Sequence, residues 1–278
     1  MHLFLLVTLT MTAFASNSLL NRLGVSNYGM DPMVFAVIRT AAGAAMLAAL
    51  VLLRGQGGLS LMTRKRAAGA LALAVYMIGF SWSYLTLGAG LGALILFGVL
   101  QVVMFGWAVV EGQAISPLKW CGGAIAMAGL VILLWPGGAT AVPFAGAVAM
   151  LAAGVAWAAY TLLGRGEPDA LAATAGNFIL CLPLVALLLA VADAGTITMP
   201  GVLTALVAGA VTSGLGYALW YRCLPQLATV TASVAQLSVP VIAVGAGVLL
   251  LSEPLTARLV LAGGLVLGGI GISLKPVR

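Results

Sequence analysis

Apolar residues run in long segments along almost the whole chain, and only short clusters of glycine, proline and charged residues separate them. A helix needs about 20 apolar residues to cross the hydrocarbon core of a bilayer. Dividing the chain at these clusters predicts ten such helices, over 3–21, 32–53, 67–87, 91–110, 119–135, 143–164, 171–192, 200–221, 227–251 and 256–274. Because unpaired backbone groups are very unfavourable in lipid, the pattern indicates an all-α polytopic membrane protein.

Composition excludes the soluble alternatives. The 278 residues are 63% hydrophobic and only 6% charged, whereas soluble domains carry roughly 25% charged residues. The net charge of +6 comes from basic residues that stand singly, apart from the cluster Arg64-Lys65-Arg66. A nucleic-acid-binding protein would instead show a basic patch interleaved with aromatic residues, so no nucleic-acid partner is expected.

The basic residues indicate how the chain sits in the membrane, because lysine and arginine concentrate in cytoplasmic loops. Ten spans place both termini on one side. If that side is the cytoplasm, the inner segments hold nine basic residues, Arg54, Arg64, Lys65, Arg66, Lys119, Arg165, Arg222, Lys275 and Arg278. The outer loops then hold only Arg22 and Arg258. We therefore expect an integral protein of the bacterial inner membrane with both termini in the cytoplasm.

The chain contains an internal repeat. Residues 13–22 (AFASNSLLNR) align with residues 156–165 (AWAAYTLLGR) at a shift of 143, and five of the ten positions are identical. A second block follows at a shift of 142 and joins an acidic residue to a row of small residues, Glu111, Gly122, Ala126 and Gly129 opposite Glu253, Gly264, Gly268 and Gly271. Two blocks with nearly the same shift predict two repeats, residues 1–138 and 139–278.

The small residues of the second block share one helix face, where another helix can approach closely. This face packs either against helices of the same half or against a second copy. Packing against a second copy would form a homodimer through the fifth and tenth spans.

Since each repeat holds five spans, the second must be inserted upside down relative to the first. Inverted repeats of this kind recur in secondary transporters, with the substrate site near the midplane between the halves. Together with the A-[FW]-A…LL-x-R block and the Glu-then-glycine block, this organisation resembles the EamA-type branch of the drug/metabolite transporter superfamily. The resemblance implies a basket around a central cavity, lined mainly by spans 1, 3, 4, 6, 8 and 9. It also implies export of amino acids, including aromatic ones.

Polar and aromatic side chains inside the spans are candidates for a site, because polar groups are rare in a bilayer. Asn17 and Tyr160 occupy equivalent positions in the repeat. Asn17 shares a helix face with Phe14 and Ser18, and Tyr160 shares the matching face with Trp157. These faces line a cavity or form hydrogen bonds between helices, and we favour the cavity.

Other aromatic residues divide between the cavity and the membrane surface. Tyr76 in the third span and Tyr217 in the eighth lie deep enough to be predicted cavity residues. Tyr84 lies nearer the interface, where a place in the aromatic belt is at least as fitting. Trp120 and Trp135 bracket the fifth span and are predicted to anchor it at the two interfaces.

Two amides add hydrogen-bonding capacity within the spans. Gln101 in the fourth span and Gln236 in the ninth can bind a neutral group or a zwitterion, and we add Ser238 to the predicted substrate-binding residues. Pro240 removes a helix hydrogen bond and frees the carbonyl of Gln236. It is therefore a candidate hinge, although a kink that serves packing alone is equally consistent with the sequence.

Arg39 is the one charge well inside a span, about seven residues into the second helix. It either binds a substrate carboxylate, snorkels to the outer interface or forms a structural pair.

Missing motifs narrow the function. The chain has no G-x-x-x-x-G-K-[ST] sequence and a single histidine, His2, so neither an ATP motor, a cofactor nor a metal site is predicted. We therefore expect a secondary transporter, an exporter of small amphiphilic metabolites such as aromatic or hydrophobic amino acids. Its expected partners are that small molecule and membrane lipids. The alternatives are an intramembrane enzyme and a non-transporting assembly subunit.

Overall fold

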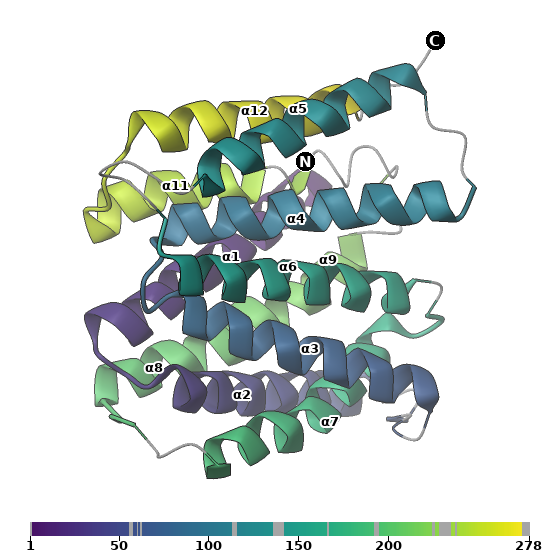
Figure 1. The fold of residues 1–278 in the computed structure, drawn as a ribbon. Helices are drawn as coiled ribbons and strands as arrows, with labels where there is room; N and C mark the ends of the chain where they lie inside the picture. Colours follow the sequence, from purple (N-terminus) through teal and green to yellow (C-terminus); the bar gives the residue numbers. More distant parts are fainter. Residues whose placement is uncertain are drawn as a thin grey trace.

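The computed structural model describes residues 2–55, 58–59, 61, 63–112, 116–135, 142–165, 167–191, 195–223, 226–227, 235–236 and 238–273. Within these residues the chain is all-α. The elements are α1 (His2–Arg22), η1 (Leu23–Asn27), α2 (Pro32–Leu53), α3 (Arg64–Ser83), α4 (Ala89–Val110), α5 (Pro117–Leu134), α6 (Phe144–Gly164), α7 (Ala170–Val191), α8 (Met199–Val207), η2 (Ala208–Leu215), α9 (Gly216–Cys223), α11 (Ser238–Leu251) and α12 (Ala257–Ser273). Helices α2, α3, α4 and α6 run side by side, while α1 and the segment from α8 to α9 cross obliquely behind them (Figure 1). The fold class predicted from the sequence is confirmed.

In the described part of the chain, seven helical segments are long and apolar enough to cross a membrane. Helices α11 and α12 are shorter apolar helices. Helix α3 begins at Arg64, three residues before the predicted start, because the Thr63 side chain caps it by accepting a hydrogen bond from the Arg66 N–H at 3.1 Å. The basic cluster therefore forms the first turn of this span.

Two contacts of α3 define the ends of the bundle. Arg22 donates to the carbonyl of Tyr84, directly after α3, at 2.9 Å. Lys65, in the first turn of α3, donates to the carbonyl of Arg165 at 3.3 Å. Because α3 is about 30 Å long, Arg22 and Arg165 lie at opposite ends, which we name the Arg22 end and the Arg165 end. The equivalent helices α1 and α6 thus terminate at opposite ends of the bundle (Figure 1).

The eighth span is not the continuous α-helix that the sequence predicted. It runs from α8 through the π-helix η2 into α9. A π-helical turn shifts the side chains that follow it to a new face, and such turns are frequent at functional sites. A Cβ at Gly209 in η2 would lie 2.2 Å from the carbonyl oxygen of Arg39 in α2. Glycine here permits the close approach of η2 and α2.

The small residues of α5 are used inside the chain. A Cβ at Gly129 would lie 2.9 Å from the carbonyl oxygen of Ala262 in α12, and a Cβ at Gly269 would lie 2.5 Å from the nitrogen of Ala126 in α5. The helices α5 and α12 therefore pack together at one edge of the bundle (Figure 1). The small residues of α5 thus face a helix of the second half and not, as the first alternative held, helices of their own half. In the second half, Gly269 and Ala262 form this seam, because nothing lies within 4 Å of a Cβ at the predicted seam residues Gly264, Gly268 and Gly271. A homodimer through the latter face stays a prediction from the sequence.

At the Arg165 end, ion pairs join α2 and α3 to the segment between α6 and α7. Arg54 pairs with Asp169, Lys65 contacts Glu167 at 2.9 Å and Arg66 contacts it at 2.5 Å. Burial opposes ionisation of the Glu167 carboxyl, but its hydrogen bonds to Lys65 and Arg66 outweigh this effect and lower its pKa. The hydrogen bond from Arg54 likewise lowers the pKa of Asp169. The pairs therefore fasten helices of the first half to the second.

The aromatic belt is partly as predicted. The side chains of Trp120 and Trp135 are 54% and 64% exposed at opposite ends of α5, which suits interfacial anchoring. Tyr84, by contrast, is 0% exposed and packs edge-on against Phe80 at 4.9 Å between ring centroids. The belt alternative for Tyr84 is therefore wrong, because its ring is buried between Phe80 and Gly92 of α4.

Candidate functional site

A continuous series of aromatic rings crosses the middle of the bundle. Phe14 of α1 lies 5.6 Å from Tyr217 of α9, and Tyr217 lies 5.4 Å from Trp157 of α6, measured between ring centroids. Trp157 lies 4.9 Å from Tyr76 of α3, which lies 5.1 Å from Phe80 on the same helix. The rings come from both halves of the chain and form one aromatic wall.

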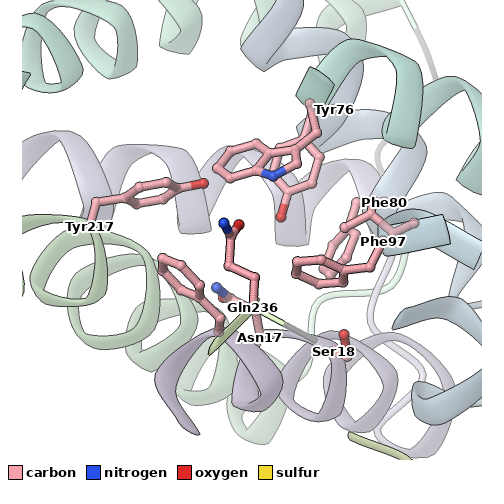
Figure 2. Close-up of a pocket in the computed structure, with 10 residues that line it drawn as sticks. Asn17, Ser18, Tyr76, Phe80, Phe97, Tyr217 and Gln236 are labelled. Atoms are coloured by element: carbon pink, nitrogen blue, oxygen red, sulfur yellow. The ribbon is translucent and has the colours of Figure 1, made fainter. Parts of the chain in front are cut away.

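These rings line a small cavity that is partly open to the outside. Ten residues from six spans line it, namely Phe14, Asn17, Ser18, Tyr76, Phe80, Leu96, Phe97, Trp157, Tyr217 and Gln236. Gln236 extends its amide toward the middle of the group, with Tyr217 on one side and Phe97 on the other (Figure 2). The lining is thus mostly aromatic with a few hydrogen-bonding groups, which is typical of a site for a small amphiphilic molecule.

A polar network lies behind one side of the cavity. Arg39 Nε donates to Ser213 Oγ at 3.2 Å, and Arg39 Nη2 donates to the hydroxyl of Tyr76 at 3.2 Å. Thr212 and Ser213 both contact Asn17 Oδ1, at 2.6 Å and 3.4 Å. The π-helix η2 supplies Thr212 and Ser213 side by side, so it joins Asn17 on α1 to Arg39 on α2.

Arg39 does not snorkel to the interface. Its side chain is 0% exposed, and its guanidinium carbon lies 5.4 Å from the ring centre of Tyr76 and 5.0 Å from that of Phe80. Cation–π contacts of this kind stabilise a desolvated guanidinium. Its Nη1 atom has no hydrogen-bond partner among the described residues. The snorkelling alternative is therefore wrong, and Arg39 is a buried cation one layer behind the cavity wall.

The structure brings five of the predicted substrate-binding residues together around the cavity and places the others nearby. The five are Asn17, Tyr76, Trp157, Tyr217 and Gln236. Tyr160 is buried and stacks on Trp157 at 5.5 Å. Gln101 lies one turn beyond Phe97 on α4, toward the Arg165 end. Ser238 donates to the backbone carbonyl of Ala235 at 2.6 Å, so neither Tyr160, Gln101 nor Ser238 is part of the lining.

The predicted hinge Pro240 is buried in the described first turn of α11. The residue before Ser238 lies outside the described residues. Proline has no N–H, so the carbonyl of Gln236 receives no helical hydrogen bond from position 240.

Sequence analysis missed three contributors to the site. Leu96 and Phe97 line the cavity from α4 but belong to an apolar run that gives no sign of which face is turned inward. Thr212 was missed because nothing in the sequence of the eighth span marks it as facing Asn17. No local sequence signal predicts the π-helix.

An acidic residue of the second half closes the Arg22 end. Glu253 Oε1 accepts the N–H of Ala89, the first residue of α4, at 2.7 Å, and lies 3.6 Å from Arg22 Nε. Helix α4 begins after Gly88, which provides no side-chain cap. Glu253 therefore caps a helix of the first half.

Comparison with known proteins agrees with this architecture. The sequence profile of the EamA-like transporter family matches residues 144–275. An uncharacterized protein of Pseudomonas aeruginosa is 45% identical over 274 residues, which cover 98% of this chain and 94% of that protein. An uncharacterized transporter of Archaeoglobus fulgidus is 26% identical over 255 residues, covering 88% of this chain and 90% of that protein. A crystal structure with 19% sequence identity shares the fold at a TM-score of 0.68, covering 98% of this chain and 97% of the other.

The match to a transporter family and the transporter among the relatives indicate that this bundle of apolar helices is a polytopic membrane transporter. The chain belongs to the EamA-like transporter family, within the drug/metabolite transporter superfamily.

Proposed function

We propose that this transporter is a secondary exporter of small amphiphilic metabolites, such as aromatic or hydrophobic amino acids. The observation that carries the proposal is the cavity, where aromatic rings from α1, α3, α6 and α9 surround the amides of Asn17 and Gln236. Rings bury the apolar part of a solute, while amides and hydroxyls fix its polar part. Asn17, Tyr76, Trp157, Tyr217 and Gln236 contact the solute directly, and Arg39 acts on it through Tyr76.

The transport step is alternating access, in which the two halves rock about the cavity. The proposal divides the chain into repeats 1–138 and 139–278, whose equivalent helices α1 and α6 end at opposite ends of the bundle (Figure 1). Pro240 serves as the hinge of the ninth span. The sequence carries no phosphate-binding loop for an ATP motor, which supports transport driven by solute or ion gradients.

The charge bias of the loops supports a location in the bacterial inner membrane with the Arg165 end in the cytoplasm. Glu253 joins the start of α4 to Arg22 at the Arg22 end. A cavity closed at that end and accessible from the Arg165 end would load solute from the cytoplasm, as export requires.

Counterflow in reconstituted vesicles tests the proposal. Vesicles loaded with unlabelled L-phenylalanine should accumulate labelled L-phenylalanine, whereas L-glutamate should give little exchange. Trp157→Ala removes the central ring and should reduce phenylalanine exchange by at least about tenfold. Trp135→Ala, at the exposed end of α5, is the matched control and should leave exchange unchanged. Exchange that survives both Trp157→Ala and Gln236→Ala would remove the cavity from the transport pathway.

A further inference from the structure

The hydrogen bonds around Arg39 have a fixed direction. A guanidinium has donors only, so Tyr76 and Ser213 must each accept from it. The hydroxyl proton of Tyr76 is then directed away from Arg39, and Tyr76 lines the cavity. The cation therefore polarises a donor that faces the solute.

The hydrogen bond from Arg39 to Ser213 also leads to a donor at the cavity wall. Ser213 accepts from Arg39 Nε at 3.2 Å, so its own proton is available to Asn17 Oδ1 at 3.4 Å. With its oxygen engaged by Ser213 and Thr212, the Asn17 amide turns its N–H donors toward the cavity that it lines. Both branches begin at Arg39 and end in a donor at the cavity wall.

The charge of Arg39 is not balanced by an acidic partner in the described structure. The ion pairs of the described residues use Glu253, Asp169 and Glu167, and none of these pairs includes Arg39. No acidic side chain is among the described residues that line the cavity. A buried positive charge with outward-facing donors favours an anionic group in the cavity.

We propose that the cavity selects solutes by a carboxylate, held by the Tyr76 hydroxyl and the Asn17 amide and stabilised by the charge of Arg39. The apolar part of the solute packs against Trp157 and Phe14. An α-ammonium group is not required, so aromatic monocarboxylates bind as well as amino acids. This inference rests on the proposed function and identifies which chemical group of the substrate is recognised.

Three aromatic probes of similar size test it by quenching of tryptophan fluorescence in the purified transporter. They are 3-phenylpropionate, its methyl ester and L-phenylalanine. The two carboxylates should bind with comparable affinity, and the ester should bind about tenfold to hundredfold more weakly, because it lacks the charge-assisted hydrogen bonds. Tyr76→Phe keeps the ring and removes the hydroxyl, so it should lower acid binding to the level of the ester. Tyr28→Phe, outside the cavity, is the matched control.

The outcomes separate the two proposals. Equal binding of acid and ester, or unchanged discrimination in Tyr76→Phe, would overturn carboxylate recognition and leave an aromatic cavity as proposed. If none of the three probes binds, the proposed function fails together with this inference. Arg39→Gln is a second variant, but the conclusion does not depend on its folding, since Tyr76→Phe preserves the packing.

The ion pair at the Arg22 end has repeat equivalents at the Arg165 end, and these indicate how the Arg165 end closes. Arg22 and Glu253 meet at the Arg22 end, at 3.6 Å, with Glu253 also capping α4. Their repeat equivalents are Arg165, which follows α6, and Glu111, which follows α4. Glu111 therefore lies at the opposite end of the helix that Glu253 caps, at the same end of the bundle as Arg165.

In the present conformation both equivalents are exposed. Glu111 accepts a hydrogen bond from Trp107 Nε1 at 2.7 Å, one turn earlier on α4. The surrounding half of α4 has no buried residue. If the halves exchange conformations in alternating access, Arg165 and Glu111 take up the relationship that Arg22 and Glu253 have here. We infer that Arg165 and Glu111 form the ion pair that closes the Arg165 end when the Arg22 end opens.

Cross-linking tests this without a transported solute. The three native cysteines, Cys121, Cys181 and Cys223, are first replaced by alanine, and Arg165→Cys and Glu111→Cys are introduced together. A bifunctional thiol reagent as long as an arginine–glutamate pair should join them in lipid vesicles. Arg22→Gln weakens the opposite pair and should raise the yield about twofold to fivefold, as expected for a partly exposed ion pair.

Arg258→Gln is the matched control, because it removes a charge at the Arg22 end whose guanidinium donates to the carbonyls of Ile132 and Trp135 at the end of α5. Its cross-linking yield should equal that of the parent. Glu253→Gln, which can still cap α4, is a second way to weaken the Arg22 pair. No cross-link in any background, or a yield insensitive to both Arg22→Gln and Glu253→Gln, contradicts the inference while leaving the cavity and its solute untouched.

Discussion

Arg39 Nη2 donates a hydrogen bond to the hydroxyl of Tyr76 at 3.2 Å, while the guanidinium also lies 5.4 Å from the centre of the same ring. The ring face of Tyr76 thus stabilises the buried charge through a cation–π contact, and the hydroxyl oxygen of Tyr76 accepts a hydrogen bond from Arg39. A lone charge at the centre of a spanning helix would be unfavourable by about 2.5–3.5 kcal/mol on insertion scales. The pairing indicates that Arg39 and Tyr76 act as one unit.

Because they act as one unit, their substitutions should be non-additive. We expect Arg39→Gln and Tyr76→Phe each to weaken binding of 3-phenylpropionate about tenfold or more. The double variant should be no weaker than the stronger single variant, which corresponds to a coupling of about 1 kcal/mol or more. Fluorescence titrations of the four proteins measure this cycle, and fully additive losses would show that the two residues act separately.

Glu253 should stabilise α4 in two separable ways. Glu253→Ala removes both the cap on Ala89 and the contact with Arg22, and we expect a loss of about 0.5–2 kcal/mol. Glu253→Gln keeps an oxygen for the cap and should lose less. Thermal unfolding in detergent should therefore rank the wild type above Gln and Gln above Ala. An equal loss for both variants would mean that the cap contributes nothing.

Two neighbouring glycines of α12 should respond differently to substitution by alanine, because only one of them faces the seam with α5. A Cβ at Gly269 would meet the backbone of Gly122 and Ala126 at 2.5 Å, whereas nothing lies within 4 Å of a Cβ at Gly268. Gly269→Ala should destabilise the fold by about 1–3 kcal/mol, since backbone has to move apart. Gly268→Ala should be neutral or slightly stabilising, because alanine is the better helix former. Similar melting temperatures for the two variants would place the seam elsewhere.

Acid should loosen the Arg165 end. The pKa values of Glu167 and Asp169 are lowered in the folded protein, so their ion pairs contribute fully above the ordinary carboxyl values of 4.5 and 3.8. That stability is lost as the pH falls below this range and the folded carboxyls become protonated. The melting temperature should drop in this window, and Glu167→Gln should make the drop shallower. A wild-type profile that stays flat to pH 3 would contradict the assignment.

The orientation of the halves predicts opposite labelling of two exposed positions. On a background without native cysteines, Asn27→Cys after α1 should react with an impermeant maleimide added outside intact cells. Arg165→Cys after α6 should react only after the membrane is permeabilised, because positive charge concentrates at that end. If both positions react from the same side, the two five-span repeats do not face opposite ways.

The extent of the spans followed from the sequence because the bilayer imposes a length and an apolar composition on every helix. The ends of α2, α4 and α6 lie within about two residues of their predicted positions. The aromatic and amide residues of the cavity could also be predicted from the sequence, since Asn17, Trp157 and Gln236 are unusual residue types within apolar segments. The repeat added which of these segments are equivalent.

Only the tertiary structure decided what these residues contact. Arg39 is buried behind Tyr76 because a π-helix, which no local signal marks, brings Ser213 and Thr212 against α1 and α2. Glu253 caps α4 because a loop of the second half meets a helix of the first, a contact between segments far apart in the chain. Membrane insertion constrains each helix by its own composition, and the sequence therefore specifies the helices. Packing between helices depends on small residues and single polar contacts spread over the whole chain, and these are defined only when the helices are assembled.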